Sequence, residues 1–178
     1  IGGSQDLTTA MYEAYKQSKK LVSIASIDSR FDLGSPGQPS SNTAWLGEVI
    51  MQQPTYLFNF SNIGHQTYFV GSESVDFMNK LYFDTYRLGQ VRSELQEIEP
   101  VIRACDILSF DLSSIRQADA PGSTHPSPNG FSGEEACQLM LYAGLNDQLT
   151  SVGVFELNIE ADRNEQTAHL IAQMVWYL

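Results

Sequence analysis

The sequence contains few of the residues that most often mark a chemical site or a special cellular environment. Its 178 residues include only two cysteines, Cys105 and Cys137, and three histidines. Two cysteines so far apart form neither a zinc motif nor a disulfide framework, so we expect both thiols to be reduced and buried. This cysteine usage predicts a cytoplasmic protein.

Positive charge and long apolar runs are also scarce. The chain has 10 basic against 21 acidic residues, a formal net charge of −11. Because nucleic acids and anionic membranes are bound by clustered Lys and Arg, we expect neither as a partner. No apolar run approaches the roughly 18 residues that a membrane span needs. The pair Gly2 and Gly3 lacks the spacing of a phosphate-binding loop, and no Gly-x-Ser-x-Gly motif of a serine nucleophile is present.

The residues that are present are those of a folded protein. Hydrophobic residues make up 42% of the chain and charged residues 17%, which is ordinary for a globular protein and argues against disorder. The length fits one domain. We therefore interpret residues 1–178 as a single α/β domain.

Apolar runs alternate with segments of helical periodicity. Four runs predict strands that are buried on both faces, at residues 21–27, 55–60, 106–110 and 151–157. Helices are expected at residues 8–20, 42–53, 73–88, 92–103 and 132–144, and from residue 165 to the end. This alternation predicts a mainly parallel sheet covered on both faces, which is a three-layer α/β/α sandwich.

Some helix boundaries carry their own signals. Ser132 with Glu135 three residues later predicts a capping box. Thr8 or Thr9 is the expected N-cap of the first helix, and Gly89 is the expected C-cap of the helix at residues 73–88. The proline-containing segment at residues 115–131 predicts a long loop, and loops of that length are usually functional or disordered.

Three aspartates stand where predicted strands end: Asp28 and Asp32 after the first strand, and Asp111 after the third. In an open α/β sheet the ligand crevice lies beyond the carboxyl ends of the strands. We therefore expect these carboxylates to face one shared site.

The segments that hold these aspartates, with two others, resemble the signature blocks of the ureohydrolase superfamily of arginase, agmatinase and formimidoylglutamase. The first six residues, Ile-Gly-Gly-Ser-Gln-Asp, resemble Gly-Gly-Asp-His-Ser, and residues 28–32 resemble Asp-Ala-His-x-Asp. Residues 109–122 resemble Ser-Phe-Asp-x-Asp-x-x-Asp-Pro followed by Ala-Pro-Gly, and residues 155–158 resemble Val-Glu-x-Asn. Overall likeness is nearest to formimidoylglutamase.

The resemblance implies an arginase-like fold, hydrolysis of a C–N bond in a small amidino or formimino compound, and a homo-oligomer. In that family the first block is preceded by further strands, so we expect this chain to be a fragment. The family binds two manganese ions, which lower the pKa of a bound water. Their ligands are four carboxylates and two imidazoles.

Only half of those ligand positions hold a ligand in this chain. Asp28, Asp32 and Asp111 fall on carboxylate positions. The two imidazole positions hold Gln5 and Arg30. The second ligand position of the last block holds Ser113, and the aspartate next to the proline is replaced by Arg116.

The substitution at Arg30 bears most on the metal. A guanidinium is always protonated and cannot bind a cation. Between Asp28 and Asp32 it is expected to hydrogen-bond both carboxylates. Three aspartates and one arginine leave a charge of −2, which suits at most one divalent cation and not a manganese pair.

Glu156 and Asn158 have two readings. In the family the matching glutamate binds the guanidinium or amidine end of the substrate, which makes both residues candidates for substrate binding. Alternatively, Glu156 is solvated or pairs with Arg30. Perturbed carboxylates occur in binding sites and in structural ion pairs alike, so both readings stay open.

The histidines and a run of aromatic residues offer weaker signals. His65 is expected in a loop that walls the pocket, and His125 lies in the long loop and could approach the crevice. His169 is expected within the last helix, either on its surface or packed. The aromatic residues from Tyr82 to Tyr86 have helical spacing, which predicts a core or subunit contact.

Two hypotheses of different classes follow. The chain is either a hydrolase that acts on an amidino or formimino compound, or an inactive homologue that serves in binding, oligomerisation or regulation. The resemblance favours the hydrolase, while the fixed charge of Arg30 at a ligand position favours the inactive homologue.

Overall fold

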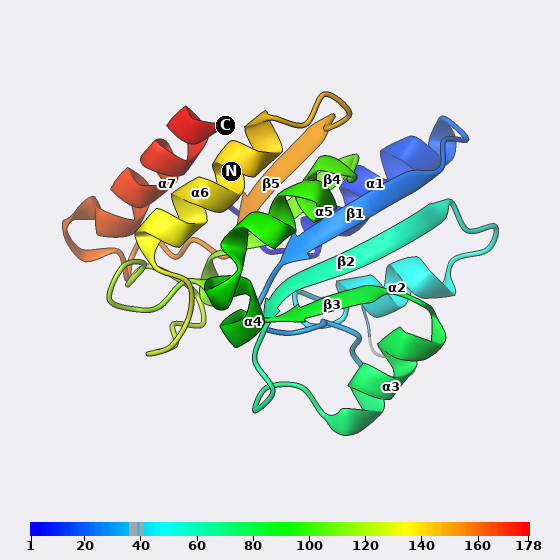
Figure 1. Ribbon diagram of the computed structural model, residues 1–178, viewed down its shortest axis with the longest axis horizontal. Helices are drawn as coiled ribbons and strands as arrows, with labels where there is room; N and C mark the ends of the chain where they lie inside the picture. Colours follow the sequence, from blue (N-terminus) through cyan, green and yellow to red (C-terminus); the bar gives the residue numbers. More distant parts are fainter. Residues whose placement is uncertain (36–38, 40) are drawn as a thin grey trace.

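A five-stranded parallel sheet lies at the centre of the structure (Figure 1). The structure is a computed structural model that describes residues 1–35, 39 and 41–178. All neighbouring strands are parallel, in the order β3-β2-β1-β4-β5. Their bounds are β1 (Val22–Ile27), β2 (Leu57–His65), β3 (Asp84–Arg87), β4 (Ile107–Asp111) and β5 (Ser151–Phe155).

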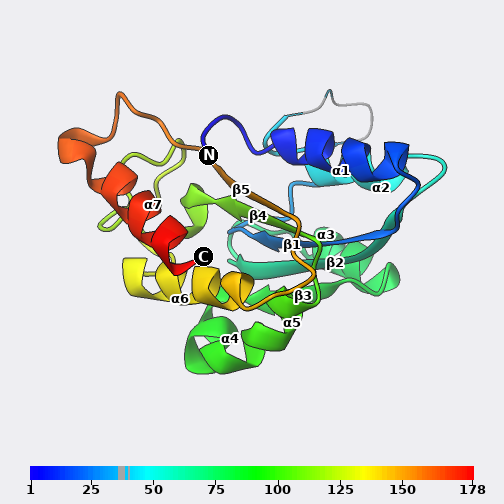
Figure 2. The ribbon, with the colours of Figure 1, turned by 90° about the horizontal axis from the view of Figure 1, so that it is seen from above.

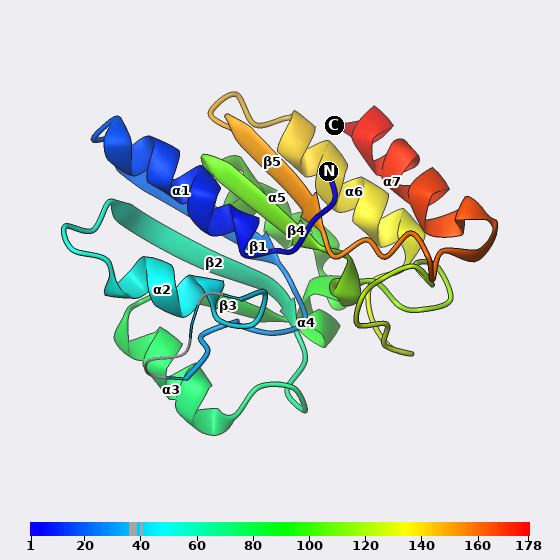
Figure 3. The ribbon, with the colours of Figure 1, turned by 180° about the vertical axis from the view of Figure 1, so that it is seen from behind.

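Helices cover both faces of the sheet, which confirms the predicted three-layer α/β/α arrangement (Figures 2 and 3). One face packs against α1 (Leu7–Gln17), α2 (Trp45–Met51) and α3 (Ser72–Lys80). The other packs against α4 (Leu88–Ser93), α5 (Glu99–Arg103), α6 (Gly133–Gly144) and α7 (Gln166–Tyr177). Three short 3-10 helices are η1 (Leu95–Ile98), η2 (Leu112–Ser114) and η3 (Arg163–Glu165).

Each central strand supplies side chains to two separate cores. In β1, Ile24 packs in the core under α1 and α2, whereas Ala25 and Ile27 pack in the core under α4, α5 and α6. Successive residues of a strand point to opposite faces, so a strand covered on both sides must be apolar throughout. This is why continuous apolar runs correctly predicted β1, β4 and β5, whereas β2 continues to His65, beyond the predicted residues 55–60.

The predicted helix at residues 73–88 is wrong in its second half. Helix α3 ends at Lys80, Tyr82 adopts a positive φ of 58°, and Asp84–Arg87 forms the edge strand β3 beside β2. Gly89 therefore lies inside α4 and is not a C-cap. The aromatic spacing misled because a left-handed residue at Tyr82 redirects the chain, and Tyr82 itself is 90% exposed.

Of the remaining predicted helix caps, one is confirmed and one is wrong. The capping box at Ser132 and Glu135 is present in full. The first helix instead has Asp6 at its N-cap without a side-chain bond, and the hydroxyl of buried Thr8 lies 2.8 Å from that of Ser109. Cys105 and Cys137 are free and buried, as expected. In the part of the chain that the structure describes, no helix is long and apolar enough to cross a membrane.

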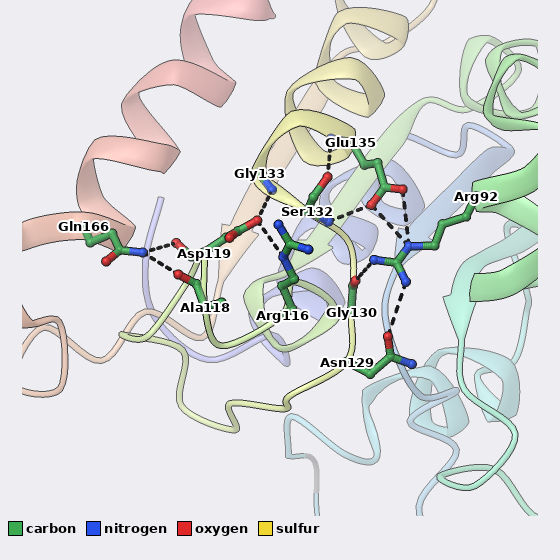
Figure 4. A network of polar contacts seen from close by, with 10 residues as sticks. All are labelled: Arg92, Arg116, Ala118, Asp119, Asn129, Gly130, Ser132, Gly133, Glu135 and Gln166. Carbon is green, nitrogen blue, oxygen red and sulfur yellow. Dashed lines mark hydrogen bonds and ion pairs between the residues drawn. The ribbon is translucent and has the colours of Figure 1, made fainter.

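The long loop at residues 115–131 is held in place by its neighbours. Arg116 N donates to the carbonyl of Phe131, and Thr124 N donates to that of Glu156. At the loop's end, the guanidinium of Arg92 donates to Asn129 Oδ1 and to the carbonyl of Gly130 (Figure 4). The loop therefore forms an ordered wall beside the carboxyl ends of the strands.

Strand order fixes where a ligand can bind. From β1 the chain runs outward to β2 and β3, then returns to place β4 on the other side of β1. The connections thus leave in opposite directions at the carboxyl ends of β1 and β4. Such a switch point is where open α/β sheets form their ligand crevice.

Candidate metal centre

Three aspartates meet at this switch point, as the sequence predicts. Asp28 follows β1, Asp111 ends β4, and Asp32 lies in the loop after β1. A ligand oxygen from each lies within 4.8 Å of the other two. All three side chains are buried, with exposed fractions of 1% for Asp28, 7% for Asp32 and 6% for Asp111.

Backbone and indole N–H groups orient the three carboxylates. Asp28 Oδ1 accepts a hydrogen bond from Arg30 N at 2.8 Å, and Asp111 Oδ1 accepts one from Ser113 N at 2.6 Å. Asp32 Oδ2 accepts from the indole Nε1 of Trp45 at 3.2 Å. The carboxylates are therefore held in place before any ligand arrives.

The electrostatics of the cluster are unfavourable without a cation. Burial, followed by the charge of Asp32, raises the pKa of Asp28 well above its ordinary value. Burial and the charge of Asp28 raise the pKa of Asp111 in the same way. Burial is also the main cause that raises the pKa of Asp32 to about 7. Buried charges of one sign need protons or a counter-ion, and a divalent cation would meet that need.

Gln5 lies at the base of this cluster. Its side chain is fully buried, and Nε2 donates to the hydroxyls of Ser26 at 3.3 Å and Ser109 at 3.2 Å. A hydrogen bond from Gln5 also lowers the pKa of Asp28, which places the amide next to that carboxylate. Gln5 Oε1 has no partner among the described residues.

The expectation that Arg30 hydrogen-bonds Asp28 and Asp32 is wrong. No ion pair or side-chain hydrogen bond joins its guanidinium to a carboxylate among the described residues, and Arg30 Cζ lies 4.2 Å from the centroid of the Phe69 ring. Stacking on an aromatic face is a common alternative for arginine. The charge of Arg30 still lowers the pKa of Asp32, as the smallest of the causes that act on it.

Glu156 and Asn158 differ in burial and in their hydrogen-bond partners. Glu156 is buried, adopts a positive φ of 68°, and its Oε1 accepts from Gln5 N at 2.8 Å. It therefore pairs with the backbone of Gln5 and not with Arg30. Its charge also raises the pKa of Asp111, so it lies near the aspartates. Asn158 is exposed, and its Oδ1 accepts from Glu160 N at 3.1 Å within a local turn.

Ser113 and the histidines take separate places. Ser113 is buried, and its hydroxyl lies 3.5 Å from that of Ser29.

His65 is the last residue of β2, not part of a loop, and is buried against the ring of Phe31. His125 Nε2 lies 3.3 Å from Asn42 Nδ2, and His169 is exposed on α7, as expected. No histidine joins the candidate metal cluster among the described residues.

Several contributors could not be found from sequence reasoning. Trp45 lies 13 residues after its partner Asp32, at the start of α2, and Ser26 and Ser109 supply hydroxyls from the interior of β1 and β4. The one available signal for the serines was a polar residue inside an otherwise apolar strand. Such a residue is buried only where it finds a partner.

Comparison with known proteins identifies the family to which the sequence is similar. The family model described as the Arginase family matches residues 1–178. The formimidoylglutamase of Staphylococcus aureus strain MRSA252 is 25% identical over 185 residues, which cover 98% of this chain and 58% of that protein. The chain thus spans less than two thirds of the curated relatives it matches.

Solved structures show the same fold. A variant of Trypanosoma cruzi formiminoglutamase crystallised with Mn2+ superposes with a TM-score of 0.89 at 18% identity, over 98% of this chain and 61% of that one. Entamoeba histolytica arginase in complex with L-ornithine gives a TM-score of 0.85 at 20% identity, over 100% of this chain and 68% of that one.

Proposed function

The chain belongs to the arginase family, and we propose that it binds a single divalent metal ion, manganese first, in place of the family's pair. The observation that carries this proposal is the convergence of three buried carboxylates within 4.8 Å of one another. An ion held by oxygen ligands suits manganese or magnesium, and imidazole is not required.

The donor set decides the number of ions. Asp28, Asp32 and Asp111 supply carboxylate oxygens, whereas Gln5 presents its amide donor to Asp28 and adds no ligand there. Arg30 and Ser113, which occupy the remaining ligand positions, offer a cation and a neutral hydroxyl. Because the guanidinium lies over Phe69, it adds no ligand for a second ion.

A bound divalent ion would supply Lewis acidity and lower the pKa of a coordinated water. The residues of the chain would position that ion. The carboxylates are fixed by the backbone amides of Arg30 and Ser113 and by the indole of Trp45. One carboxylate oxygen of Glu156 accepts from Gln5 N, and its other oxygen is an acceptor for a cationic group of a ligand. With one ion, this arrangement favours binding of a small amidino or formimino molecule over the family's two-metal hydrolysis. The chain is then a metal-binding homologue without that activity.

Metal stoichiometry tests the proposal. The purified chain is stripped with EDTA, equilibrated with excess Mn2+, desalted, and analysed for metal per chain. We expect a value near one, which falls to near zero in Asp111→Asn and is unchanged in Asp76→Asn, an exposed acid on α3. A value near two, or near zero for the unmodified chain, contradicts the proposal.

Hydrolysis of a C–N bond in an amidino or formimino compound is the second candidate. It is supported by the names of the relatives and by the buried Glu156 beside the aspartates. An assay for ammonia or urea release from formimino and guanidino compounds separates the two. Mn2+-dependent release that is lost in Glu156→Gln favours the hydrolase, while binding without release favours the inactive homologue. A homo-oligomer and a cytoplasmic location remain predictions.

A further inference from the structure

Asn62 is a polar residue in the buried half of β2. It is fully buried, and it lies two residues after Phe60, so it points to the face of the sheet that packs against α1 and α2. Its Nδ2 donates to the backbone carbonyl of Arg30 at 2.7 Å, and its Oδ1 has no partner among the described residues. A buried amide that is only half satisfied costs stability, so the hydrogen bond to Arg30 is what this residue contributes.

The Arg30 carbonyl lies midway between two of the clustered aspartates. Residues 28–32 form the loop that carries Asp28 and Asp32, with Arg30 at its centre. Arg30 N donates to Asp28 Oδ1 at 2.8 Å, and its carbonyl accepts from Asn62. The two peptide groups on either side of the Arg30 Cα are therefore both fixed, one by an aspartate of the cluster and one by β2.

Asp32 needs such support because its backbone adopts a disfavoured conformation. Its φ is 50°, in the left-handed region, where the Cβ of an L-residue crowds the backbone. Non-glycine residues stay there only where the surrounding structure holds them. From α2, Trp45 Nε1 donates to Asp32 Oδ2 at 3.2 Å and Leu46 N donates to its carbonyl at 3.1 Å. From β2, Asn62 holds the chain two residues earlier.

Backbone hydrogen bonds hold the start of the same loop to β2. Asp28 N donates to the Ile63 carbonyl, and Gln66 N donates to the Ser29 carbonyl, each at 3.0 Å. These two bonds do not depend on the side chain at position 62, whereas the attachment of Arg30 needs the amide of Asn62. A substitution at position 62 therefore removes one attachment of the loop and keeps the other two.

We propose that Asn62 is a positioning residue of the candidate metal centre, because its hydrogen bond to the Arg30 carbonyl holds Asp28 and Asp32 so that they face one ion together with Asp111. This inference rests on the proposed single-ion site, and Asn62 acts there through the backbone and not as a ligand. The three carboxylates offer oxygens within 4.8 Å of one another, so a small rotation of residues 30–32 would separate Asp32 from the other two. Loss of an outer partner of this kind typically weakens metal affinity by about 10–100-fold.

Asn146 provides a matched control at the opposite end of the sheet. It is a buried asparagine after α6, and its Nδ2 donates to the carbonyls of Ile102 at 3.0 Å and Cys105 at 2.7 Å. Its Oδ1 accepts from Gln148 N at 2.8 Å. Cys105 precedes β4 and Asp111 ends it, so Asn146 lies at the other end of that strand from the aspartates. Asn146 thus matches Asn62 in residue type, burial and bonding to backbone carbonyls, but not in place.

Titration of the EDTA-stripped and desalted chain with Mn2+ tests the proposal, with free Mn2+ measured by electron paramagnetic resonance. Asn62→Leu keeps a side chain of similar size without the donor, and we expect its dissociation constant for Mn2+ to rise by about tenfold or more. Asn146→Leu should leave that constant unchanged. It should nevertheless lose more stability in urea than Asn62→Leu, because it loses three hydrogen bonds instead of one. Equal Mn2+ affinity in Asn62→Leu and the unmodified chain, or an equal loss of affinity in both variants, overturns the proposal.

Hydrogen exchange of the Arg30 amide gives a readout that needs no metal. In EDTA, Asn62→Leu should lower the protection of the Arg30 N–H by about tenfold or more, and Asn146→Leu should not change it. Uptake of no Mn2+, or of two ions, by the unmodified chain would contradict the proposed function, and the exchange experiment would then decide on Asn62 by itself. Unchanged protection of the Arg30 N–H in Asn62→Leu overturns the positioning role. If the leucine variant does not fold, Asn62→Ala is measured in the same two ways.

Discussion

The guanidinium carbon of Arg30 lies 4.2 Å from the centroid of the Phe69 ring, while the backbone N–H of the same residue donates to Asp28 Oδ1. One residue thus contributes its amide to the candidate metal centre and keeps its charge outside it. In the proposed single-ion site the missing ligands are the reason that a second ion does not bind, and substitution can supply such ligands.

Restoring two ligands should restore a second ion. In Arg30→His with Ser113→Asp, an imidazole and a fourth carboxylate join the three aspartates, so we expect the manganese content to rise from near one to near two per chain. Elemental analysis after desalting gives the number. Arg103→His combined with Asp76→Asn is the control and should leave the content at one. No gain in the double variant would mean that these positions do not converge on the aspartates.

The acidic cluster should also limit the stability of the metal-free protein. Asp32→Asn keeps an oxygen for the indole of Trp45 and removes one of three mutually repelling charges. In EDTA at pH 7.5 we expect the free energy of unfolding to rise by about 1–2 kcal/mol, whereas the stabilisation gained on adding Mn2+ should be lost. Urea unfolding with and without metal measures both effects. A variant that is less stable in EDTA would show that the carboxylates are not in conflict.

His65 should make stability depend on pH. Its folded pKa of about 4 lies below the ordinary 6.5, so the unfolded chain binds a proton first as pH falls. The stability that the neutral His65 ring contributes is fully present above pH 6.5. It is lost as pH falls from 6.5 to 4, by up to about 3 kcal/mol of the free energy of unfolding. The difference in unfolding free energy between the unmodified chain and His65→Phe should therefore shrink over that window. A difference that stays constant from pH 7.5 to 4.5 would contradict the assignment.

The capping box of α6 should contribute measurably. Ser132 accepts from Glu135 N at 3.2 Å, and Glu135 accepts from Ser132 N at 2.7 Å. Ser132→Ala should reduce the free energy of unfolding by about 1 kcal/mol, and Ser132→Thr should retain most of it. Chemical denaturation compares the two. Equal losses in both variants would indicate that packing at the site, and not the cap, is responsible.

Two glycines should respond to alanine with opposite signs. An added Cβ at Gly89 meets nothing within 4 Å, so Gly89→Ala within α4 should stabilise by about 0.5–1 kcal/mol. At Gly64 the φ is +105° and a Cβ would lie 2.5 Å from the Phe131 ring. Gly64→Ala should therefore destabilise by about 2 kcal/mol or more. Thermal unfolding of the pair gives the signs directly.

Sequence patterns located the strands better than the turns between them. The apolar runs of β1, β4 and β5 follow from burial on both faces, which leaves no alternative period. The edge strand β3 was missed because Asp84–Arg87 is only four residues long and is half exposed, so it has neither a continuous apolar run nor a clear alternation. The left-handed residue at Tyr82, which ends the preceding helix, has no composition signal of its own.

At the site, position could be predicted but orientation could not. The aspartates converge because strand ends in a parallel sheet share one edge, which is a property of topology. Where Arg30 points depends on Phe69, which lies beyond the end of β2 and has no fixed spacing from Arg30 in a motif. The position of Arg87 at the end of β3 likewise could not be predicted, because the sequence patterns did not indicate that strand.

The hydrogen bond from Gln5 N to Glu156 Oε1 spans 151 positions of sequence, and Glu156 N in turn donates to the carbonyl of Gly3. The amino-terminal segment therefore holds Glu156 at the end of β5 through two hydrogen bonds. Cleavage before Gln5, or a rigid fusion there, would free the backbone of Glu156 from its positive φ. We expect such a change to lower ligand affinity before it lowers the stability of the fold.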